Sequence, residues 1–265
     1  MSMIIIGEKI NSTRKDMAQA ISQNDAAYIQ KIALEQVNAG ANMLDVNCAT
    51  QIDNEPAKMA WLVKIVQGRI NIPLVIDSPN PLAIESALKV HQGQSIINST
   101  TAEPDRIKQI FPLAQKYRAG LIALCIDEKG MPKTAQDRFE IARRLYQTAL
   151  DYKIPPEDLY IDPLVRPVAT EPGQVNEFLD SLRLIKTLKN VKTICGLSNV
   201  SFGLPDRKLL NATFVVMALA AGLDAAILDP TDKAVLARIK ASEALLNQDE
   251  YCLNYITAHR ENKLR

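Results

Sequence analysis

The stretch "KTICGLSNVSFG", residues 192–203, begins as a short apolar run and ends in glycine, serine and asparagine. A run of about four to eight apolar and β-branched residues, bounded by turn-forming residues, indicates a buried strand. The polar residues that follow the run carry no charge. This strand should therefore end at an edge that presents hydroxyl and carboxamide groups.

Seven other runs have the same form, and longer segments with helical spacing of apolar residues lie between them. The predicted strands are MIIIGE (3–8), NMLDVN (42–47), PLVIDS (73–78), QSIINS (94–99), GLIALCID (120–127), LYIDP (159–163), KTICGLSN (192–199) and AAILDP (225–230). The predicted helices cover residues 26–39, 81–91, 105–118, 136–152, 174–189, 208–221 and 233–246.

Nearly continuous apolar strands that alternate with helices are typical of a parallel sheet covered by helices. Eight such units predict a closed (β/α)₈ TIM barrel, and a chain of 265 residues has the length of one such domain. We therefore expect a single domain over residues 1–265. A doubly wound open sheet is the alternative, but neither a Gly-x-Gly-x-x-Gly turn nor a Gly-x-x-x-x-Gly-Lys loop is present.

Composition narrows the range of partners. The chain has 31 Lys and Arg against 30 Asp and Glu and no block of five like charges, which disfavours nucleic acid. The apolar run 3–6 is too short for a signal peptide, and Asp224 interrupts the apolar stretch 214–228, so we expect no membrane anchor. The four cysteines form no Cys-x-x-Cys pair, which disfavours a zinc site or a disulfide framework. A cytoplasmic location fits best.

The predicted strands end in carboxylates and carboxamides. Barrel enzymes place their sites at the carboxyl ends of the strands, so these side chains should meet at one mouth. Neither histidine, His91 or His259, falls there, which disfavours imidazole as base or ligand. The strand-end residues are Glu8, Asn11, Asp45, Asn47, Asp77, Asn98, Asp127, Asp162, Asn199 and Asp229.

A single strand-end aspartate often caps the next helix or bonds a loop amide, and Asp77 and Asp229 fit that role best. The set as a whole predicts a neutral ligand rich in hydrogen-bonding groups. Carboxylates accept hydrogen bonds and carboxamides both donate and accept, which suits a flat heterocycle such as a reduced pterin. A Mg²⁺ site is the competing use of these carboxylates, although no phosphate-binding cation or glycine nest accompanies them, and we expect no metal.

Six motifs resemble the pterin-binding methyltransferases, which use methyltetrahydrofolate and a corrinoid protein. The motifs are GEKIN (7–11), LDVN (44–47), VIDS (75–78), INST (97–100), YIDPL (160–164) and, above all, GLSNVSFG (196–203). The resemblance spans all eight predicted strands. It implies a TIM barrel, a homodimer and a folate substrate bound at the mouth. It also implies a separate corrinoid (cobalamin) protein as partner, because the chain has no Asp-x-His-x-x-Gly signature of its own.

The resemblance assigns roles to individual residues. Asn199 matches the catalytic asparagine that reaches N5 of the pterin. The positions that match the family's substrate-binding crevice are Asp77, Asn98, Asp162, Gly196, Ser198 and Asn199, and Arg207 and Phe202 fall where the aminobenzoate tail runs. The implied reaction is methyl transfer between N5 of tetrahydrofolate and the cobalt of the corrinoid protein, in acetogenesis or in O- or N-demethylation.

A neutral carboxamide suits this chemistry. It can donate to unprotonated N5 or accept from N5–H, whereas a lysine or arginine at position 199 would repel the charge that develops on the nitrogen. No side chain with a fitting pKa can be assigned from the sequence, so we expect the proton to arrive through water.

Two other functions share the predicted pocket. Dihydropteroate synthases typically carry Ser-Arg-Lys at the seventh strand and Arg-x-His at the eighth, where this chain reads SNV and LDPTD, so a diphosphate would meet no cation. A non-catalytic folate-binding protein stays open on sequence grounds. The direction of net transfer and the upstream methyl donor stay open as well.

Overall fold

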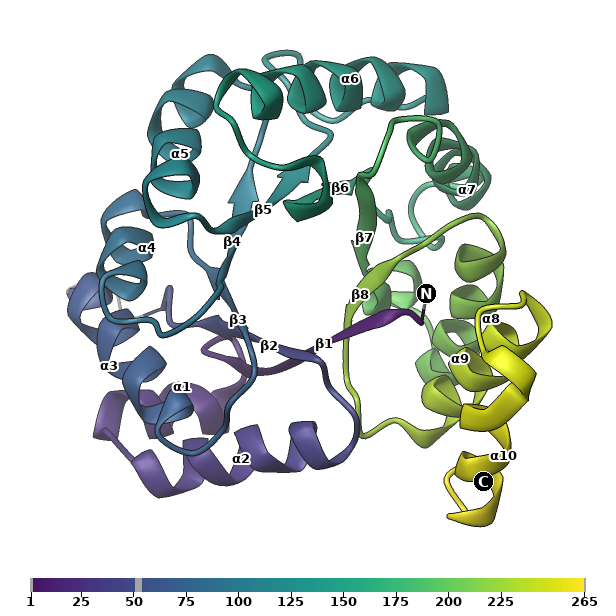
Figure 1. The fold of residues 1–265 in the computed structure, drawn as a ribbon, viewed down its shortest axis with the longest axis horizontal. Helices are drawn as coiled ribbons and strands as arrows, with labels where there is room; N and C mark the ends of the chain where they lie inside the picture. Colours follow the sequence, from purple (N-terminus) through teal and green to yellow (C-terminus); the bar gives the residue numbers. More distant parts are fainter. Residues whose placement is uncertain (1, 51–53, 265) are drawn as a thin grey trace.

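The computed structural model describes residues 2–50 and 54–264. Eight parallel strands follow one another around a closed barrel, because β1 pairs with both β2 and β8 (Figure 1). The strands are β1 Ile4–Asn11, β2 Met43–Asn47, β3 Leu74–Asp77, β4 Ile96–Thr100, β5 Gly120–Leu124, β6 Leu159–Asp162, β7 Lys192–Gly196 and β8 Ala225–Leu228. The predicted TIM barrel is confirmed.

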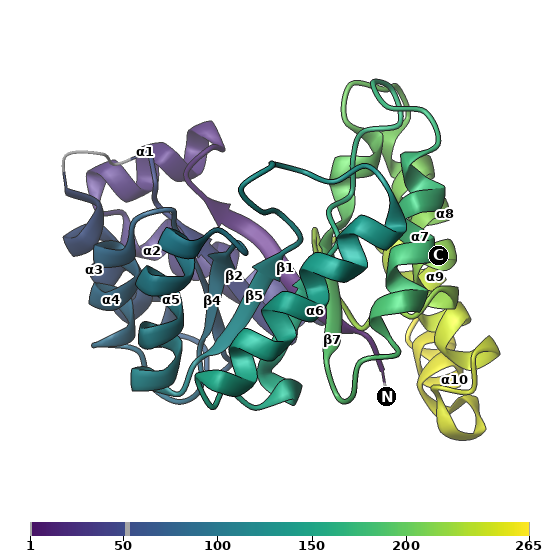
Figure 2. The same ribbon diagram turned by 90° about the horizontal axis from the view of Figure 1, so that it is seen from above.

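A ring of helices covers the outside of the barrel. The helices are α1 Lys15–Gln23, α2 Ala26–Asn38, α3 Glu55–Gln67, α4 Pro81–Leu88, α5 Pro104–Tyr117, α6 Ala135–Asp151, α7 Gln174–Ile185, α8 Arg207–Ala220, α9 Lys233–Leu245 and α10 Leu253–Arg260. All seven helices named in the sequence analysis have a counterpart, and α1, α3 and α10 are additional. In Figure 2 the strands run from the N-terminus at the lower edge toward the loops at the upper edge. No described helix is long and apolar enough to cross a membrane.

The strands are apolar almost throughout because both of their faces are buried. Inside the barrel lies a small cluster that seven of the eight strands build, one residue each: Ile6, Val75, Ile96, Ile122, Tyr160, Ile194 and Ala225. Two larger clusters fill the layer between the strands and the helices. The barrel interior is thus a packed core, and the polar ends of the strands have only the mouth to occupy.

Two strands, β5 and β7, end three residues earlier than the sequence predicts, at Leu124 rather than 127 and at Gly196 rather than 199. The β7 pairing with β8 stops at Gly196 opposite Ile227, and Leu197–Ser201 form a 3₁₀ helix, η3, so Asn199 lies on a turn beyond the strand. β5 stops at Leu124, and Asp127 lies in a tight turn closed by its backbone hydrogen bonds with Gly130. In both places the apolar residues continue past the point where backbone pairing ends.

Candidate functional site

Two carboxamide–carboxylate pairs form the rim of the mouth between β2 and β4. Asn47 Nδ2 donates to Asp77 Oδ2 at 2.9 Å, and Asn98 Nδ2 donates to Asp45 Oδ1 at 3.0 Å. The register explains this arrangement, because Asn47 lies beside Asp77 and Asp77 beside Asn98 in neighbouring strands. The pairs hold the two carboxyl groups in place, and Arg106 lines the cavity next to Asp77 and Asn98.

Neither of the aspartates predicted to cap a helix does so. Asn80 caps α4 through Leu82 N, so the cap prediction for Asp77 is wrong, and the Asp77 side chain faces Asn47 instead. Asp229 accepts from Thr231 N at 2.9 Å within the β8–α9 loop, as a loop-bonding aspartate should. The cap of α9 is Asp232, whose carboxylate accepts from Ala234 N.

Burial sets the protonation of the rim. It raises the pKa of Asp45 well above its usual range, and the neighbouring Asp77 carboxylate adds to the increase because two like charges cannot both ionise there easily. Burial also raises the pKa of Asp77, against the hydrogen bond from Asn47. Two carboxyl groups so close together therefore resist carrying two charges, which suits a neutral ligand better than a cation.

Asp162 ends β6 and forms another part of the mouth. Its Oδ1 accepts a hydrogen bond from Leu164 N at 2.7 Å, which fixes the orientation of the carboxyl group. Burial raises the pKa of Asp162 to about 7, while the Leu164 N–H and the Arg138 guanidinium act in the opposite direction. The side chain thus changes its charge close to neutral pH.

The η3 turn brings together the predicted residues that follow β7. A Cβ atom on Gly196 would lie 3.0 Å from Asn199 Nδ2, so the carboxamide rests against this glycine and needs the space that a side chain would take. Arg207, the first residue of α8, donates from Nη2 to Ser198 O at 2.7 Å and from Nε to Ser201 Oγ at 3.1 Å. Arg207 therefore holds the turn that carries Asn199.

Glu8 lies on the same side of the mouth as this turn. Burial raises the pKa of Glu8 and the Asp229 carboxylate adds to the increase, whereas Arg14, Arg207 and the Ser198 hydroxyl lower it. Arg14 Nη2 donates to Glu8 Oε1 at 2.7 Å. Glu8 is thus an ionisable group next to Ser198, one residue from Asn199, a relation that only the fold makes visible.

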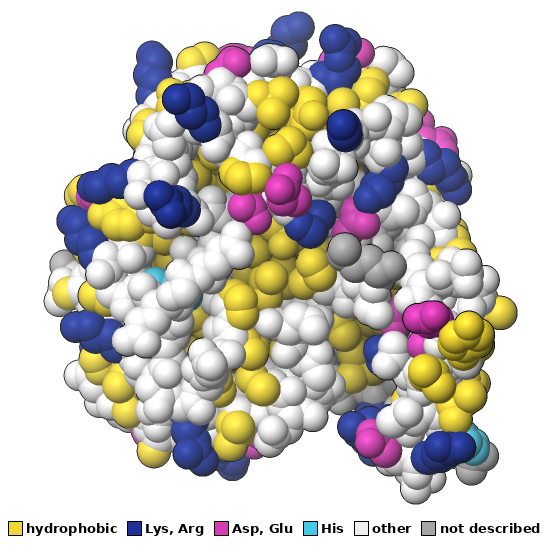
Figure 3. Space-filling view, in the orientation of Figure 1, with side chains coloured by type: hydrophobic (Ala, Val, Ile, Leu, Met, Phe, Trp, Pro, Cys, Tyr) yellow, Lys and Arg dark blue, Asp and Glu magenta, His cyan; other side chains and the backbone are white. Residues whose placement is uncertain are grey.

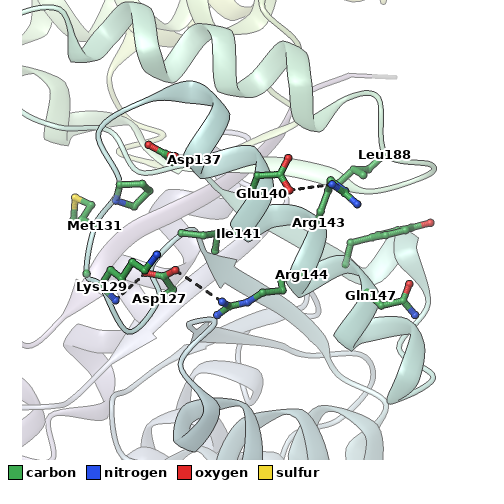
Figure 4. A pocket seen from close by; sticks show the side chains of 13 residues that line it. Asp127, Lys129, Met131, Asp137, Glu140, Ile141, Arg143, Arg144, Gln147 and Leu188 are labelled. Atoms are coloured by element: carbon green, nitrogen blue, oxygen red, sulfur yellow. Dashed lines mark hydrogen bonds and ion pairs between the residues drawn. The ribbon is translucent and has the colours of Figure 1, made fainter.

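Two cavities lie near the strand ends. The smaller, of about 400 Å³, opens at the mouth and is lined in part by Asp77 and Asn98. The larger, of about 830 Å³, lies between α6 and the β5–α6 loop (Figure 4). Asp127 lines this larger cavity, so its predicted place in the mouth is wrong. The cations there face acids, with Arg143 Nη1 2.9 Å from Glu140 Oε2 and Arg144 Nη1 3.9 Å from Asp127 Oδ2.

The predicted site residues fall into two groups. The first group, at the ends of β3 and β4, is Asp77 and Asn98. The second group is the hydrogen-bonded turn after β7, with Gly196, Ser198, Asn199 and Arg207. Asp162 ends β6, which lies between these strands in the barrel order. Among residues 2–50 and 54–264, no group of three or more His, Cys, Asp or Glu is placed to hold a metal ion. The strand ends offer neutral and acidic hydrogen-bonding groups, and Arg14, Arg106 and Arg207 lie beside them.

Comparison with known proteins agrees with this donor set. The family model described as "Pterin binding enzyme" matches residues 7–229, from β1 to the end of the barrel. The chain belongs to this family. A methylcorrinoid:tetrahydrofolate methyltransferase of Eubacterium limosum is 32% identical over 265 residues, which are 99% of this chain and 98% of that protein. The resemblance found in the sequence is confirmed.

Other members and neighbours of this pterin binding enzyme are more distant. The methionine synthases of Mycobacterium tuberculosis and Mycobacterium leprae are each 30% identical over 243 residues, and the match spans 85% of this chain but about one-fifth of theirs. Solved dihydropteroate synthases of Xanthomonas albilineans (TM-score 0.69, 15% identity) and Stenotrophomonas maltophilia (TM-score 0.67, 16% identity) each cover 92% of this chain and are covered to 93% by it. At such identities they show the fold alone.

Proposed function

We propose that this pterin binding enzyme is a methyltransferase that moves a methyl group between N5 of tetrahydrofolate and the cobalt of a separate corrinoid protein. The observation that carries the proposal is the rim on which Asp77, Asn98, Asp45 and Asn47 form two carboxamide–carboxylate pairs, in which neither carboxyl group has a salt-bridge partner among the described residues. The full-length relative supports it, since that protein is named for transfer from a methylcorrinoid to tetrahydrofolate. We place this chain in the same direction, in cytoplasmic demethylation.

The two groups of site residues divide the work. Asp162, when ionised, accepts hydrogen bonds from the ring N–H and the amine of the pterin, and Asp77 and Asn98 hold the rest of the ring edge. Gly196 and Ser198 line the same crevice. Arg207 and Phe202 stand further out, with the guanidinium carbon 6.0 Å from the ring centre, where the acidic tail of the folate would pass.

Asn199 acts at N5. The corrinoid of the partner protein supplies or accepts the methyl group at cobalt. When tetrahydrofolate is the acceptor, N5 forms the new bond to carbon and its proton must leave; the Asn199 carboxamide accepts from N5–H before the transfer and donates to N5 when it is unprotonated. Glu8, whose pKa burial raises, lies beside Ser198 and can take or return that proton in place of bulk water.

A homodimer is part of the proposal, and α8 offers the surface for it. Its outward residues Leu209, Thr213, Val216, Met217 and Ala220 recur at helical spacing, are exposed and include no charge. Exposed apolar side chains continue over α10, where they are visible at the lower right of Figure 3. An uncharged stripe of this kind is typical of a surface that packs against a second copy.

Charge placed on this stripe should separate the subunits. The double substitution Val216→Glu and Met217→Glu is expected to give a monomer in sedimentation velocity, with an unchanged circular dichroism spectrum. Leu82→Glu is the matched control, because Leu82 is 66% exposed on α4, away from α8, and should leave a dimer. A wild-type protein that sediments as a monomer at micromolar concentration would refute the dimer.

The reaction itself can be tested without the partner protein. Stoichiometric 5-methyltetrahydrofolate and cob(I)alamin should yield methylcobalamin in a single turnover, seen in the visible absorbance, at a rate that depends on enzyme concentration. A non-catalytic folate-binding protein would bind 5-methyltetrahydrofolate without that absorbance change. A dihydropteroate synthase would instead consume p-aminobenzoate and a pterin diphosphate. Either of these results would replace the proposal.

A further inference from the structure

Asn47 presents its carboxamide to Asp77 in one fixed orientation. Its Oδ1 accepts from Ser12 Oγ at 3.0 Å and from Ala49 N at 3.0 Å, and its Nδ2 donates to Asp77 Oδ2 at 2.9 Å. A backbone N–H can only donate, so the atom that faces Ala49 must be the carboxamide oxygen. Turning the carboxamide over would set its amine against the Ala49 N–H and its oxygen against the Asp77 carboxylate.

The groups that fix this orientation are buried. Ser12 is 2% exposed and Asn47 is 8% exposed. Ser12 lies one residue past the end of β1, where its N donates to Asn47 O at 3.0 Å and its Oγ also accepts from Thr50 N at 3.2 Å. A buried polar group is unfavourable without its hydrogen-bond partners, so this set of contacts opposes any other arrangement of the carboxamide.

The fixed carboxamide decides what each oxygen of Asp77 can do. Oδ2 faces an N–H donor, so it stays an acceptor, and any proton that Asp77 takes up must sit on Oδ1. Oδ1 makes no hydrogen bond to a described residue, and Asp77 lines the cavity of about 400 Å³ at the mouth. Oδ1 is thus the atom of Asp77 that a ligand meets.

We propose that Asn47 is a positioning residue: held by Ser12 and Ala49, its amine fixes Asp77 Oδ2 as an acceptor, so that Asp77 turns Oδ1 to the ligand as the acceptor of an N–H group. The inference rests on the proposed function, in which that ligand is the reduced pterin. Asn47 itself need not touch the ligand, because it acts through the orientation of Asp77.

Acids surround Asp77, so the hydrogen bond from Asn47 acts against its environment. Burial raises the pKa of Asp77 and Glu55 adds to the increase, whereas Asn47 lowers it. Asp45 is a further acid close by, and Asp77 raises its pKa in turn. Arg106 lines the same cavity, but its guanidinium donates to backbone carbonyl oxygens and not to the carboxyl group. Among the described residues, Asn47 is therefore the side chain that donates to Asp77.

An exchange of the two side chains tests this geometry. In Asp77→Asn, the Asn47 amine still requires an oxygen opposite it, so the new amine at position 77 faces the ligand. The dissociation constant of 5-methyltetrahydrofolate should then rise about 10- to 100-fold. In the double variant Asn47→Asp, Asp77→Asn, the carboxylate at position 47 keeps its bonds from Ser12 and Ala49 and accepts from the new amine. Position 77 turns an oxygen to the ligand again, so the double variant should bind about tenfold more tightly than Asp77→Asn.

Calorimetry at pH 8 measures these dissociation constants, and Asn42→Asp is the matched control. Asn42 precedes β2 at the end of the barrel opposite the mouth, where its Oδ1 accepts from Ile5 N at 2.8 Å. Adding Asn42→Asp to Asp77→Asn should therefore restore no affinity. If Asn47 merely supported the fold, the losses from Asn47→Asp and Asp77→Asn would add in the double variant, which would overturn the proposal. The comparison of Asp77→Asn with the double variant holds even where Asn47→Asp alone fails to fold.

Urea unfolding of the same proteins separates this proposal from the proposed function. Asn47→Asp alone sets two carboxyl groups against each other, and the double variant should recover the unfolding free energy that the single variant loses. If stability recovers while no protein, the wild type included, binds 5-methyltetrahydrofolate, the hold of Asn47 on Asp77 stands and the proposed ligand is wrong. If the wild type binds folate and the double variant recovers stability without affinity, Asn47 is a structural residue only and the proposal falls.

Discussion

Asp162→Asn should weaken 5-methyltetrahydrofolate binding by about 10²-fold while it stabilises the unliganded protein. The loss of affinity has the size of a charged hydrogen bond, about 1.5–3 kcal/mol, because an amide cannot accept both pterin N–H groups as a carboxylate does. The gain in stability comes from removing a buried charge. The Asn Oδ1 can still accept from Leu164 N, so the backbone that follows β6 keeps its hydrogen bond.

The stability effect has a definite pH dependence. The pKa of Asp162 is raised to about 7 in the folded protein, against about 3.9 in the unfolded chain. Between these values the folded state binds the extra proton, so wild-type stability falls as pH rises toward 7. The full penalty, at most about 4 kcal/mol, is present at pH 8 and absent near pH 4. Asp162→Asn should therefore gain about 2–4 kcal/mol over the wild type at pH 8 and nothing near pH 4.

Urea unfolding of both proteins at pH 5 and pH 8 measures this difference. Asp229→Asn is the matched control, for which the unfolding free energy should change in the opposite direction. Burial raises the pKa of Asp229, but the Thr231 hydrogen bonds and the Lys9 ammonium lower it further, so the net pKa is below its usual value. Loss of this carboxylate should therefore destabilise the protein and leave folate binding unchanged. Equal unfolding free energies for the wild type and Asp162→Asn at pH 8 would show that ionised Asp162 does not destabilise the folded protein.

The fold was predictable because eight buried strands leave the same pattern in the sequence. The ends of the strands were harder to place, since the apolar pattern continues past the pairing. Leu197 is buried on η3 and Cys125 is buried beyond β5, so neither residue type marks where the neighbouring strand stops. In "IDEKG" a turn signal was present, because Gly130 with a φ of +90° closes the turn that takes Asp127 out of the mouth.

The site residues were found by their position at strand ends, whereas their partners depend on register. Nothing in the sequence pairs Asn47 with Asp77 rather than with Asp45; the alignment of β2 with β3 does so. The position of Arg138 in the sequence is unusual for a charged residue, because it falls on the apolar stripe of α6 that Ile141, Ala142 and Leu145 continue. A charge within such a stripe points to a buried partner, and the fold shows that this partner is Gln174 Oε1 at the start of α7.

Asn199→Ala is expected to reduce the rate of methyl transfer by about 10² and to change folate affinity little. The carboxamide makes no hydrogen bond to another described residue, and the backbone of η3 is held by Arg207 through Ser198 O and Ser201 Oγ. Truncation should therefore leave the unfolding free energy within about 0.5 kcal/mol. The pterin stays bound through Asp77, Asn98 and Asp162, which the substitution does not touch.

What Asn199→Ala removes is an interaction that strengthens as the charge on N5 changes, and such an interaction lowers the barrier more than it stabilises the bound substrate. The single-turnover rate and kcat should fall together with kcat/KM, while the dissociation constant of 5-methyltetrahydrofolate is preserved. Asn98→Ala provides the contrast, because a rim residue should lose affinity first. If Asn199→Ala bound folate weakly and transferred methyl groups at the normal rate, Asn199 would belong with Asn98 among the binding residues. The proton on N5 would then need another partner, and Glu8 is an ionisable group at the mouth that could serve.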